Sequence, residues 1–470
     1  MYCIVYVAVH SKNMTYETKK LNADTISVIS AYLRLRGEHT VLLESVPTSQ
    51  EKSRYSILGL EPVHEFKATG KNISIDGVLS QSNDPFQTLS DLVVVDSPAN
   101  QYFPFQGGAI GYVGFDAIAT YENIGKTPLD DLDMPDIHMF LYETFLIFDH
   151  QKETLTIVAD NVYSHRDPTQ LHAVIAAIES RLRQPVDSEL VERALPTFEP
   201  KSNMTATSFT TMVDRIKQLI SAGDMFQMVP SQRFSFDFND DPFDFYRQLR
   251  RTNPSPYMYY MDLGDAQIVG SSPESLVTVR QGVVTTNPIA GTRKRGETAQ
   301  EDGKIAAELL HNEKELAEHT MLVDLGRNDL GKISNYGSVH VTTLLDIQKY
   351  RYVMHLVSEV TGQLRPELSA IAALKATLPA GTVSGAPKVR ALQRIYEMEP
   401  VKRGVYAGAI GYLSQDDQMD FAIAIRTMIV KKHKGYVQAG AGIVYDSKPA
   451  DEYQETINKA KALLNLGGRS

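Results

Sequence analysis

Short runs of β-branched and aromatic residues, separated by turn residues, dominate the first part of the chain. Such runs are typical of strands, because branched and aromatic side chains pack well on a pleated sheet. Residues 1–10 lack the basic segment and the long apolar core of a signal peptide, so we interpret them as a strand. We expect four further strands at 55–59, 72–77, 145–148 and 155–158.

A helical period replaces this alternation after residue 207. Met212, Ile216, Leu219 and Ile220 recur at the spacing of one helix face, which predicts a helix over 208–222 with Gly223 as its C-terminal stop. The preceding segment, 185–207, is rich in Pro, Ser, Thr and Glu, and we expect a surface connection there. It divides the chain into a strand-rich N-terminal domain, 1–190, and a second domain, 205–470.

The pentapeptide GAIGY occurs twice, at 108–112 and at 408–412. Two interpretations are open. The repeats mark equivalent strand turns in two different sheets, or the match is coincidental.

Composition narrows the class of protein. The net charge of −10 is spread over interspersed acidic and basic residues, which indicates ordinary solubility and argues against a nucleic-acid surface. A single cysteine, Cys3, excludes an internal disulfide framework and fits a reducing compartment. No apolar stretch approaches membrane-spanning length. We therefore expect a cytoplasmic protein with neither a membrane nor a nucleic-acid partner.

Two helix-like segments each carry glutamates three residues apart, Glu315 with Glu318 and Glu452 with Glu455. Residues at this spacing share a helix face, so each helix presents two carboxylates to one side. If the helices face each other, the carboxylates form a hard-oxygen site suited to Mg²⁺. The alternative is two solvated acidic faces.

Three loops rich in Gly and other small residues accompany the glutamates, at 287–296, 379–388 and 438–442. Glycine allows backbone N–H groups to approach a ligand closely, and consecutive N–H groups form anion-binding concavities. Together with Arg426 and Tyr406, these loops predict a site for a small polyanion beside a divalent cation.

These segments resemble the chorismate-utilising enzymes, and within them the anthranilate synthase component I subfamily, over nearly the whole chain. The resemblance implies an α+β fold of two domains, a sandwich of large, mostly antiparallel sheets with helices packed outside. It also implies the first committed step of tryptophan biosynthesis, in which chorismate and ammonia from glutamine give anthranilate and pyruvate. The segments that carry it are PIAGTRKRGE, EKELAEHTMLVDLGRNDLGKI, GTVSGAPKVRA and QAGAGIVYDSKPADEYQET.

The resemblance implies that Glu318 and Glu455 bind Mg²⁺ directly and that Glu452 and Glu315 lie just beyond them. Glu315 is the candidate acid for the departing hydroxyl, because crowding by other carboxylates raises a carboxyl pKa; a structural hydrogen bond is its alternative role. His355 would assist removal of the C2 proton, and its alternative is a core histidine.

Further residues would complete the site. Thr382 and Glu274 join the catalytic group, with a loop cap and a buried ion pair as their alternatives. Arg426 and Tyr406 would clamp the enolpyruvyl carboxylate. The substrate-binding residues implied by the resemblance are Gly291, Thr292, Tyr406, Arg426, Gly440, Ala441, Gly442 and Gln227.

Two positions separate the subfamilies. Aminodeoxychorismate synthase characteristically has a nucleophilic lysine where this chain has Ala290, and the water-using isochorismate and salicylate synthases have a lysine where it has Gln227. A neutral amide cannot activate water as a base. Both residues favour the anthranilate branch. Aminodeoxychorismate synthase component I and a non-catalytic sensor with a chorismate-enzyme fold remain the alternatives.

The resemblance also implies feedback by tryptophan and a partner subunit. Segments 41–45, 54–56 and 253–258 match the tryptophan inhibitor pocket, although a Pro-rich turn alone would explain the last of them. Cys3 has no nucleophile-elbow sequence around it, so we expect glutamine to be used only through a separate glutamine amidotransferase subunit, component II. The expected inhibitor residues are Ser45, Asn253, Pro256, Tyr257 and Met258.

Overall fold

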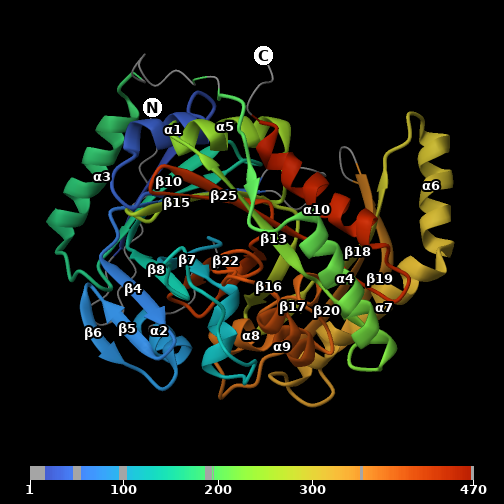
Figure 1. The fold of residues 1–470 in the computed structure, drawn as a ribbon. Helices are drawn as coiled ribbons and strands as arrows, with labels where there is room; N and C mark the ends of the chain where they lie inside the picture. The colour runs from blue at the N-terminus through green and yellow to red at the C-terminus, as the bar shows by residue number, and fades with distance from the viewer. Residues whose placement is uncertain are drawn as a thin grey trace.

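The structure is a computed structural model that describes residues 16–45, 54–94, 103–185, 193, 195–349 and 353–466. Two large antiparallel sheets lie face to face, with helices on their outer surfaces (Figure 1). The predicted α+β sandwich is therefore confirmed. No helix in the described ranges has the length and apolar character that crossing a membrane requires.

The first sheet has eleven strands in the described residues. In spatial order they are β1 (Tyr16–Asn22), β10 (Thr154–Asp160), β9 (Thr144–Asp149), β3 (Tyr55–Leu60), β2 (Val41–Glu44), β14 (Tyr257–Asp262), β15 (Ala266–Ser272), β24 (Thr427–Lys431), β25 (Lys434–Gly440), β13 (Ser231–Asp237) and β11 (Lys201–Ser202).

The second sheet has twelve strands in the same ranges, and a separate two-stranded ribbon joins β12 (Gln227–Met228) to β21 (Gly385–Ala386). In spatial order the second sheet has β18 (Ile289–Lys294), β20 (Val353–Gln363), β17 (Val283–Thr286), β16 (Ser275–Arg280), β23 (Met419–Ile423), β22 (Ala409–Ser414), β7 (Gly108–Val113), β8 (Ile137–Tyr142), β4 (His64–Thr69), β5 (Asn72–Ile75) and β6 (Val78–Gln81), with β19 (His340–Lys349) also paired to β20.

Apolar side chains of both sheets meet in one central core, which contains Ile57, Phe145 and Tyr259 from the first sheet and Ile110 and Ile410 from the second. Helices cover the two outer faces. Over the first sheet lie α1 (Val28–Leu35), α3 (Pro168–Leu182), α5 (Pro242–Thr252) and α10 (Pro449–Leu464). Against the second lie α2 (Pro85–Val93), α8 (Ala370–Thr377) and α9 (Lys388–Met398), with α4 (Ala206–Ser221) sharing their core.

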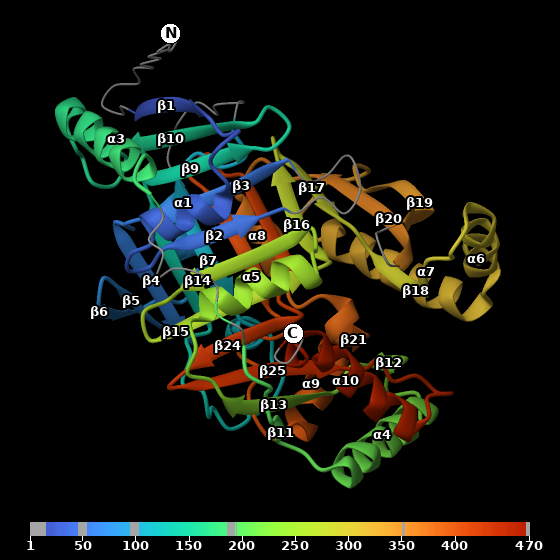
Figure 2. The same ribbon diagram turned by 90° about the horizontal axis from the view of Figure 1, so that it is seen from above.

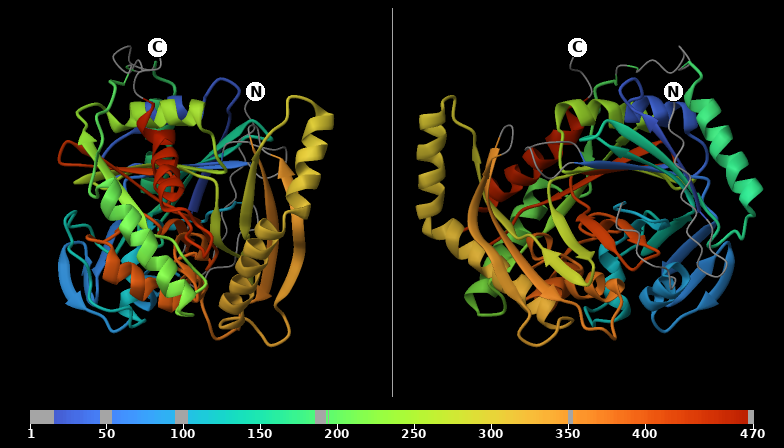
Figure 3. Two further views of the ribbon diagram at one scale, coloured as in Figure 1. Left: turned by 45° about the vertical axis from the view of Figure 1, so that its right-hand side comes forward. Right: turned by 180° about the vertical axis from the view of Figure 1, so that it is seen from behind.

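Two helices lie at one end of the second sheet, and one of them carries Glu315 and Glu318. Helix α7 (Glu313–Gly331) packs against β18, β19 and β20, and α6 (Ala299–His311) precedes it. Seen from above, these elements form one flank of the molecule (Figure 2), and α6 stands at its outer edge (Figure 3). Helix α10 contacts α4 and β25.

Most of the predicted elements are present. The four predicted strands correspond to β3, β5, β9 and β10, whereas residues 1–10 lie outside the described residues. The predicted helix is α4. The Thr205 hydroxyl accepts a hydrogen bond from the Ser208 N–H at 3.0 Å and so sets its start. Gly223, with a φ of +80°, follows its end.

The prediction of a surface connection over 185–207 is wrong at two residues. Leu195 and Phe198 are only 6% and 7% exposed, and Phe198 packs 4.5 Å from the ring of Phe236. Apolar side chains inside a polar segment thus attach it to the first sheet. Both sheets also contain strands from either side of the predicted domain boundary, so the division 1–190 and 205–470 does not separate the sheets and stays a prediction.

The interpretation that the GAIGY repeats mark equivalent turns in two sheets is wrong. Strands β7 and β22 pair antiparallel in the same sheet, with Gly111 directly opposite Gly411. A Cβ at Gly111 would lie 2.1 Å from the His138 carbonyl oxygen, and one at Gly411 would lie 2.0 Å from that of Asp420. The close approach of β8 to β7 and of β23 to β22 therefore requires glycine at both positions.

Candidate active site

Helix α7 brings Glu318 to the centre of the predicted site. The helix begins at Glu313, where the Asn312 side chain accepts a hydrogen bond from the Glu315 N–H at 3.0 Å. Oε1 of Glu318 accepts a hydrogen bond from Nε2 of Gln227 at 3.2 Å. Burial raises the pKa of Glu318, and the charges of Glu315 and Glu455 act in the same direction. The two predicted acidic helices therefore approach each other.

Helix α10 contributes Glu452 and Glu455 from its first turns. Oε1 of Glu455 pairs with Nζ of Lys459 at 2.7 Å, and Lys459 also donates to the Gly440 carbonyl at 3.0 Å. Burial raises the pKa of Glu452, and the Glu455 charge adds to the rise. Sequence reasoning missed Lys459. Its position four residues after Glu455 was the available signal, since residues at that spacing are helix neighbours.

The carboxylates fit a magnesium ion held by few protein ligands. Among the described residues, no three His, Cys, Asp or Glu side chains gather into a metal-binding group. Mg²⁺, however, is bound through one or two carboxylates, with waters and substrate oxygens completing its octahedron. Glu318 and Glu455 are close enough for their charges to interact unfavourably, and a divalent cation between them would relieve this repulsion.

Glu274 and Thr382 form a buried hydrogen-bonded pair. The Thr382 hydroxyl donates to Oε1 of Glu274 at 2.9 Å, and both residues line a small cavity of about 50 Å³. Burial raises the pKa of Glu274 to about 7, against the opposing effects of Thr382, Lys459 and Arg426. Within the described residues Glu274 forms no ion pair. A carboxyl group in these surroundings can donate a proton near neutral pH.

Glu315 has a different environment. Nη1 of Arg293 donates to its Oε1 at 3.0 Å, and its Oε2 lies 3.1 Å from where a Cβ on Gly291 would stand. Its carboxylate is thus held over Gly291 as a hydrogen-bond acceptor. Arg293 engages this carboxylate, and the role of Glu315 as the acid stays a prediction.

His355 lies on β20 opposite a bulge in β18. Gly291 occupies this bulge with a φ of +64°, a conformation that glycine adopts without strain. Nδ1 of His355 lies 3.2 Å from the Gly291 carbonyl oxygen and 3.0 Å from the Thr292 hydroxyl. A carbonyl can only accept, so Nδ1 carries the hydrogen and Nε2 the lone pair. Burial lowers the pKa of His355, which favours the neutral ring that a base requires.

Arg426 and Tyr406 border the same region. Arg426 has a φ of +49°, in the left-handed region where non-glycine residues are strained and which is enriched at functional sites. In the described part of the chain its guanidinium forms neither an ion pair nor a hydrogen bond, although Glu274 influences its pKa electrostatically. Burial raises the pKa of the Tyr406 hydroxyl to about 12, and this hydroxyl lies next to Gly440.

The Gly440–Ala441–Gly442 segment is packed tightly. A Cβ on Gly440 would lie 2.7 Å from the Pro230 carbonyl oxygen, and one on Gly442 would lie 3.0 Å from Nε2 of Gln227. The Ala441 N–H donates to the Pro230 carbonyl at 3.2 Å. That N–H is therefore engaged within the protein, which leaves the neighbouring glycines as the backbone groups of this segment that could meet a substrate.

The expected inhibitor segments converge on a second, larger cavity of about 590 Å³ between the sheets. Ser45, Pro256, Tyr257 and Met258 all line it, together with Arg54, which pairs with Asp149 at 2.7 Å. Asn253 does not; its carbonyl accepts from the Ser271 hydroxyl at 2.5 Å instead. Residues 256–258 thus form part of a cavity wall, whereas 253–255 do not line it.

Comparison with known proteins places the chain in a family. The model of chorismate binding enzymes matches residues 38–465. Anthranilate synthase component 1 of Lactococcus lactis is 52% identical over 96% of this chain and 99% of its own, and that of Acetivibrio thermocellus is 43% identical over 96% and 95%. The chain belongs to the chorismate-binding enzyme family.

Solved structures agree with this membership. The crystal structure of anthranilate synthase component I from Streptococcus pneumoniae is 50% identical and superimposes with a TM-score of 0.84, covering 94% of this chain and 98% of that one. The menaquinone-specific isochorismate synthase of Escherichia coli, 20% identical with a TM-score of 0.74 over 98% and 96% of the two chains, shares the fold.

Proposed function

We propose that this chain is the synthase component of anthranilate synthase, a lyase that converts chorismate and ammonia to anthranilate, pyruvate and water. The similarity to relatives of that name over nearly the full length supports the activity. The observation that carries the chemistry is the buried, hydrogen-bonded Glu274 whose pKa lies near 7. A carboxyl group of this kind is partly protonated near neutral pH and can act as an acid.

In the first step ammonia forms a bond to C2 of the ring while the bond from C4 to its hydroxyl breaks. Glu274 gives its proton to the departing oxygen, which leaves as water, and the Thr382 hydroxyl fixes the orientation of the carboxyl group. Gln227 donates to the proposed metal ligand Glu318 and stands where the water-using synthases have a lysine, and its amide has no basic group with which to activate water.

In the second step the C2 proton is lost and the bond from C3 to the enolpyruvyl oxygen breaks, which makes the ring aromatic. The released group gains a proton at its methylene carbon and becomes pyruvate. His355 accepts that proton at Nε2, because its Nδ1 hydrogen is directed at the Gly291 carbonyl. The planar guanidinium of Arg426 and the Tyr406 hydroxyl bind the enolpyruvyl carboxylate. Arg426 suits this role because it has no protein counter-ion in the described structure.

Glu318 and Glu455 would hold Mg²⁺, with Glu452 beside them. A bound Mg²⁺ supplies positive charge that neutralises the ring carboxylate. The approach of the two carboxylates, each unfavourable to the other's charge, supports this assignment.

We further propose feedback inhibition by tryptophan in the 590 Å³ cavity. Its wall includes the expected residues Ser45, Pro256, Tyr257 and Met258. Two residues, Ser275 and Asn287, border both this cavity and the small cavity of Glu274. A ligand in the larger cavity could therefore act on the backbone that carries the proposed acid.

The ammonia source is proposed to be a separate glutamine amidotransferase subunit. Cys3, the one cysteine, is not followed by a nucleophile-elbow sequence, so this chain has no evident means of hydrolysing glutamine. The same single cysteine supports a reducing compartment such as the cytoplasm.

An assay of nitrogen sources tests this division of labour. The purified chain, given chorismate and Mg²⁺, should form equal amounts of anthranilate and pyruvate with ammonium chloride and none with glutamine. Turnover of glutamine by this chain alone, and its persistence in Cys3→Ala, would refute the need for a partner.

A further inference from the structure

Arg403 is a buried cation beneath the proposed active site, and it is not among the residues proposed to bind the substrate or Mg²⁺. It is 2% exposed and lies on the segment that follows α9. Its Nε and Nη2 donate to the two oxygens of Glu399 at 2.9 and 2.6 Å. This bidentate pair holds the guanidinium plane in one orientation.

The guanidinium also binds the backbones of two loops that carry proposed site residues. Nη1 donates to the Val383 carbonyl at 2.7 Å, and Val383 directly follows Thr382. Nη2 donates to the Val229 carbonyl at 2.6 Å, two residues beyond Gln227. One side chain thus fixes the distance between the loop that carries Thr382 and the loop that carries Gln227.

Glu399 and the flat face of the guanidinium connect Arg403 to Gly440 and Tyr406. These two residues lie where the enolpyruvyl carboxylate is proposed to bind. Oε1 of Glu399 accepts hydrogen bonds from the Ser231 N–H at 2.8 Å and from its hydroxyl at 2.9 Å. Ser231 stands opposite Gly440 in the β13–β25 pairing. The Arg403 guanidinium lies 5.6 Å from the ring centre of Tyr406, within the range of a cation–π contact.

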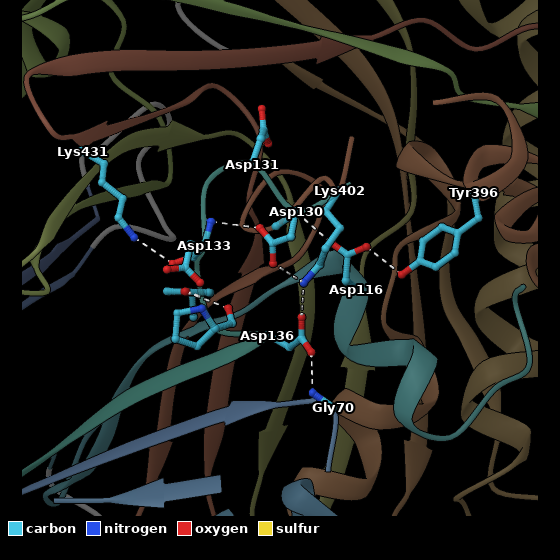
Figure 4. Close-up of polar contacts among 12 residues, drawn as sticks. Gly70, Asp116, Asp130, Asp131, Asp133, Asp136, Tyr396, Lys402 and Lys431 are labelled. Carbon is cyan, nitrogen blue, oxygen red and sulfur yellow. Dashed lines mark hydrogen bonds and ion pairs between the residues drawn. The ribbon is translucent and has the colours of Figure 1, made fainter. Parts of the chain in front are cut away.

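The residues next to Arg403 in the chain are also anchored, and Figure 4 shows the contacts of Lys402. Nζ of Lys402 pairs with Asp130 and Asp136 at 3.0 Å each. The Gly404 N–H donates to Asp116 at 2.8 Å. Tyr396, on α9, donates its hydroxyl to the same Asp116 at 2.7 Å. The residues on either side of Arg403 are therefore fixed, so its guanidinium has a defined position.

We propose that Arg403 is a positioning residue that holds Gln227, Thr382 and Tyr406 at their working separation. The inference rests on the proposed function for the roles of these three residues. A lysine would keep the positive charge but is a single point donor, so it cannot reproduce a planar fork with bonds in three directions. The alternative is a buried ion pair that serves stability alone.

Arg403→Lys separates these two roles through KM and kcat. A purely structural defect lowers the folded fraction, so the apparent kcat falls while KM for chorismate is unchanged in the molecules that remain folded. A positioning defect changes every folded molecule. We expect kcat to fall at least tenfold and KM for chorismate to rise at least threefold, with ammonium as the nitrogen source.

Hydrogen–deuterium exchange gives a second readout that does not depend on catalysis. Amides in 226–231, 381–384 and 404–408 should exchange faster in Arg403→Lys than in the unmodified protein. The matched control is Arg250→Lys. Arg250 also forms a bidentate pair with a buried glutamate, its Nη2 and Nε donating to the two oxygens of Glu44 at 2.5 and 2.7 Å, and it contacts no proposed catalytic or substrate-binding residue. That variant should keep its KM and its exchange in these segments.

If Arg403→Lys does not fold, the milder variant Ser231→Ala tests the same proposal. It removes the hydroxyl bond to Glu399 while keeping the ion pair. A KM rise of about twofold and faster exchange in 226–231 are expected. Unchanged KM and unchanged exchange in every folded variant would overturn the positioning role. If the unmodified protein does not turn over chorismate, the proposed function fails, and the exchange experiment still decides the role of Arg403.

Discussion

The Thr382 hydroxyl donates to Oε1 of Glu274 across 2.9 Å, in a cavity that raises the pKa of this carboxyl group to about 7. A donor to the ionised form lowers a pKa, so this bond opposes the effect of burial. Glu274 must be protonated to act as the acid. Activity should therefore decline as the pH rises through the pKa of Glu274.

Thr382→Val tests this relationship through the direction in which the pKa of Glu274 changes. Loss of the donor removes a stabilisation of the charged form, so the pKa of Glu274 should rise further, by about one unit. The alkaline limb of kcat/KM for chorismate should move to higher pH by that amount. The profile is measured at a constant concentration of free NH3, because the ammonium equilibrium would otherwise hide it. A limb that stays in place or moves to lower pH would exclude Glu274 as its origin.

Removal of one proposed metal ligand should raise the Mg²⁺ requirement. Glu318→Gln and Glu455→Gln each remove one negative charge from a site with two, and we expect activity at low Mg²⁺ to fall at least about tenfold. EDTA should abolish activity in the unmodified protein. The control is Asp451→Asn, an exposed carboxylate in the first turn of α10. Near-normal turnover of Glu455→Gln at low Mg²⁺ would mean that the ligand assignment is wrong.

Ser45→Phe should release the enzyme from tryptophan. Ser45 lines the 590 Å³ cavity with Pro256 and Met258, so a phenyl ring there would fill space that the inhibitor needs. We expect activity without tryptophan to remain within about twofold and inhibition to disappear. Ser45→Ala is the control that leaves the cavity open. An unmodified enzyme that is already indifferent to tryptophan would refute the regulatory assignment.

Gly411→Ala tests the close approach of β22 to its other neighbour, β23. Its Cβ would lie 2.0 Å from the Asp420 carbonyl oxygen, so the strands must move apart, and we expect a loss of about 1–3 kcal/mol in the free energy of unfolding. Gly303→Ala, on the exposed surface of α6 with no atom within 4 Å of its Cβ, should instead stabilise by up to about 1 kcal/mol. Equal denaturation midpoints for the two variants would contradict this close approach.

Local pattern predicted the elements but not their partners. The strands β3, β5, β9 and β10 and the helix α4 follow from side-chain period and capping, which neighbouring residues determine. Pairing of β7 with β22 joins residues some 300 positions apart, as the opposition of Gly111 and Gly411 shows, and no local pattern specifies such a register. The buried Leu195 and Phe198 were missed because their segment is otherwise polar.

The site was predictable as a set of residue types and less so in its roles. The sequence motifs placed both Glu274 and Glu315 in the candidate site. Only their tertiary environments distinguish the roles that the two carboxyl groups can take. Glu274 is enclosed beside Thr382, whereas Glu315 meets Arg293. Burial of a carboxyl group depends on segments distant in sequence, so its pKa cannot be derived from spacing. Lys459 and Arg403 lie outside the Gly-rich loops. Their contacts with Gly440, Val383 and Val229 join segments that are distant in the sequence, so spacing does not predict them.

Product identification with ¹⁵N-labelled ammonium tests the central claim most directly. The purified chain is incubated with chorismate, Mg²⁺ and labelled ammonium, and the products are separated and weighed by mass spectrometry. We predict anthranilate that carries one ¹⁵N atom, together with an equal amount of pyruvate. Formation of aminodeoxychorismate or 4-aminobenzoate would assign the chain to the other ammonia-using branch, isochorismate would indicate water as the nucleophile, and unchanged chorismate would identify a non-catalytic binding protein.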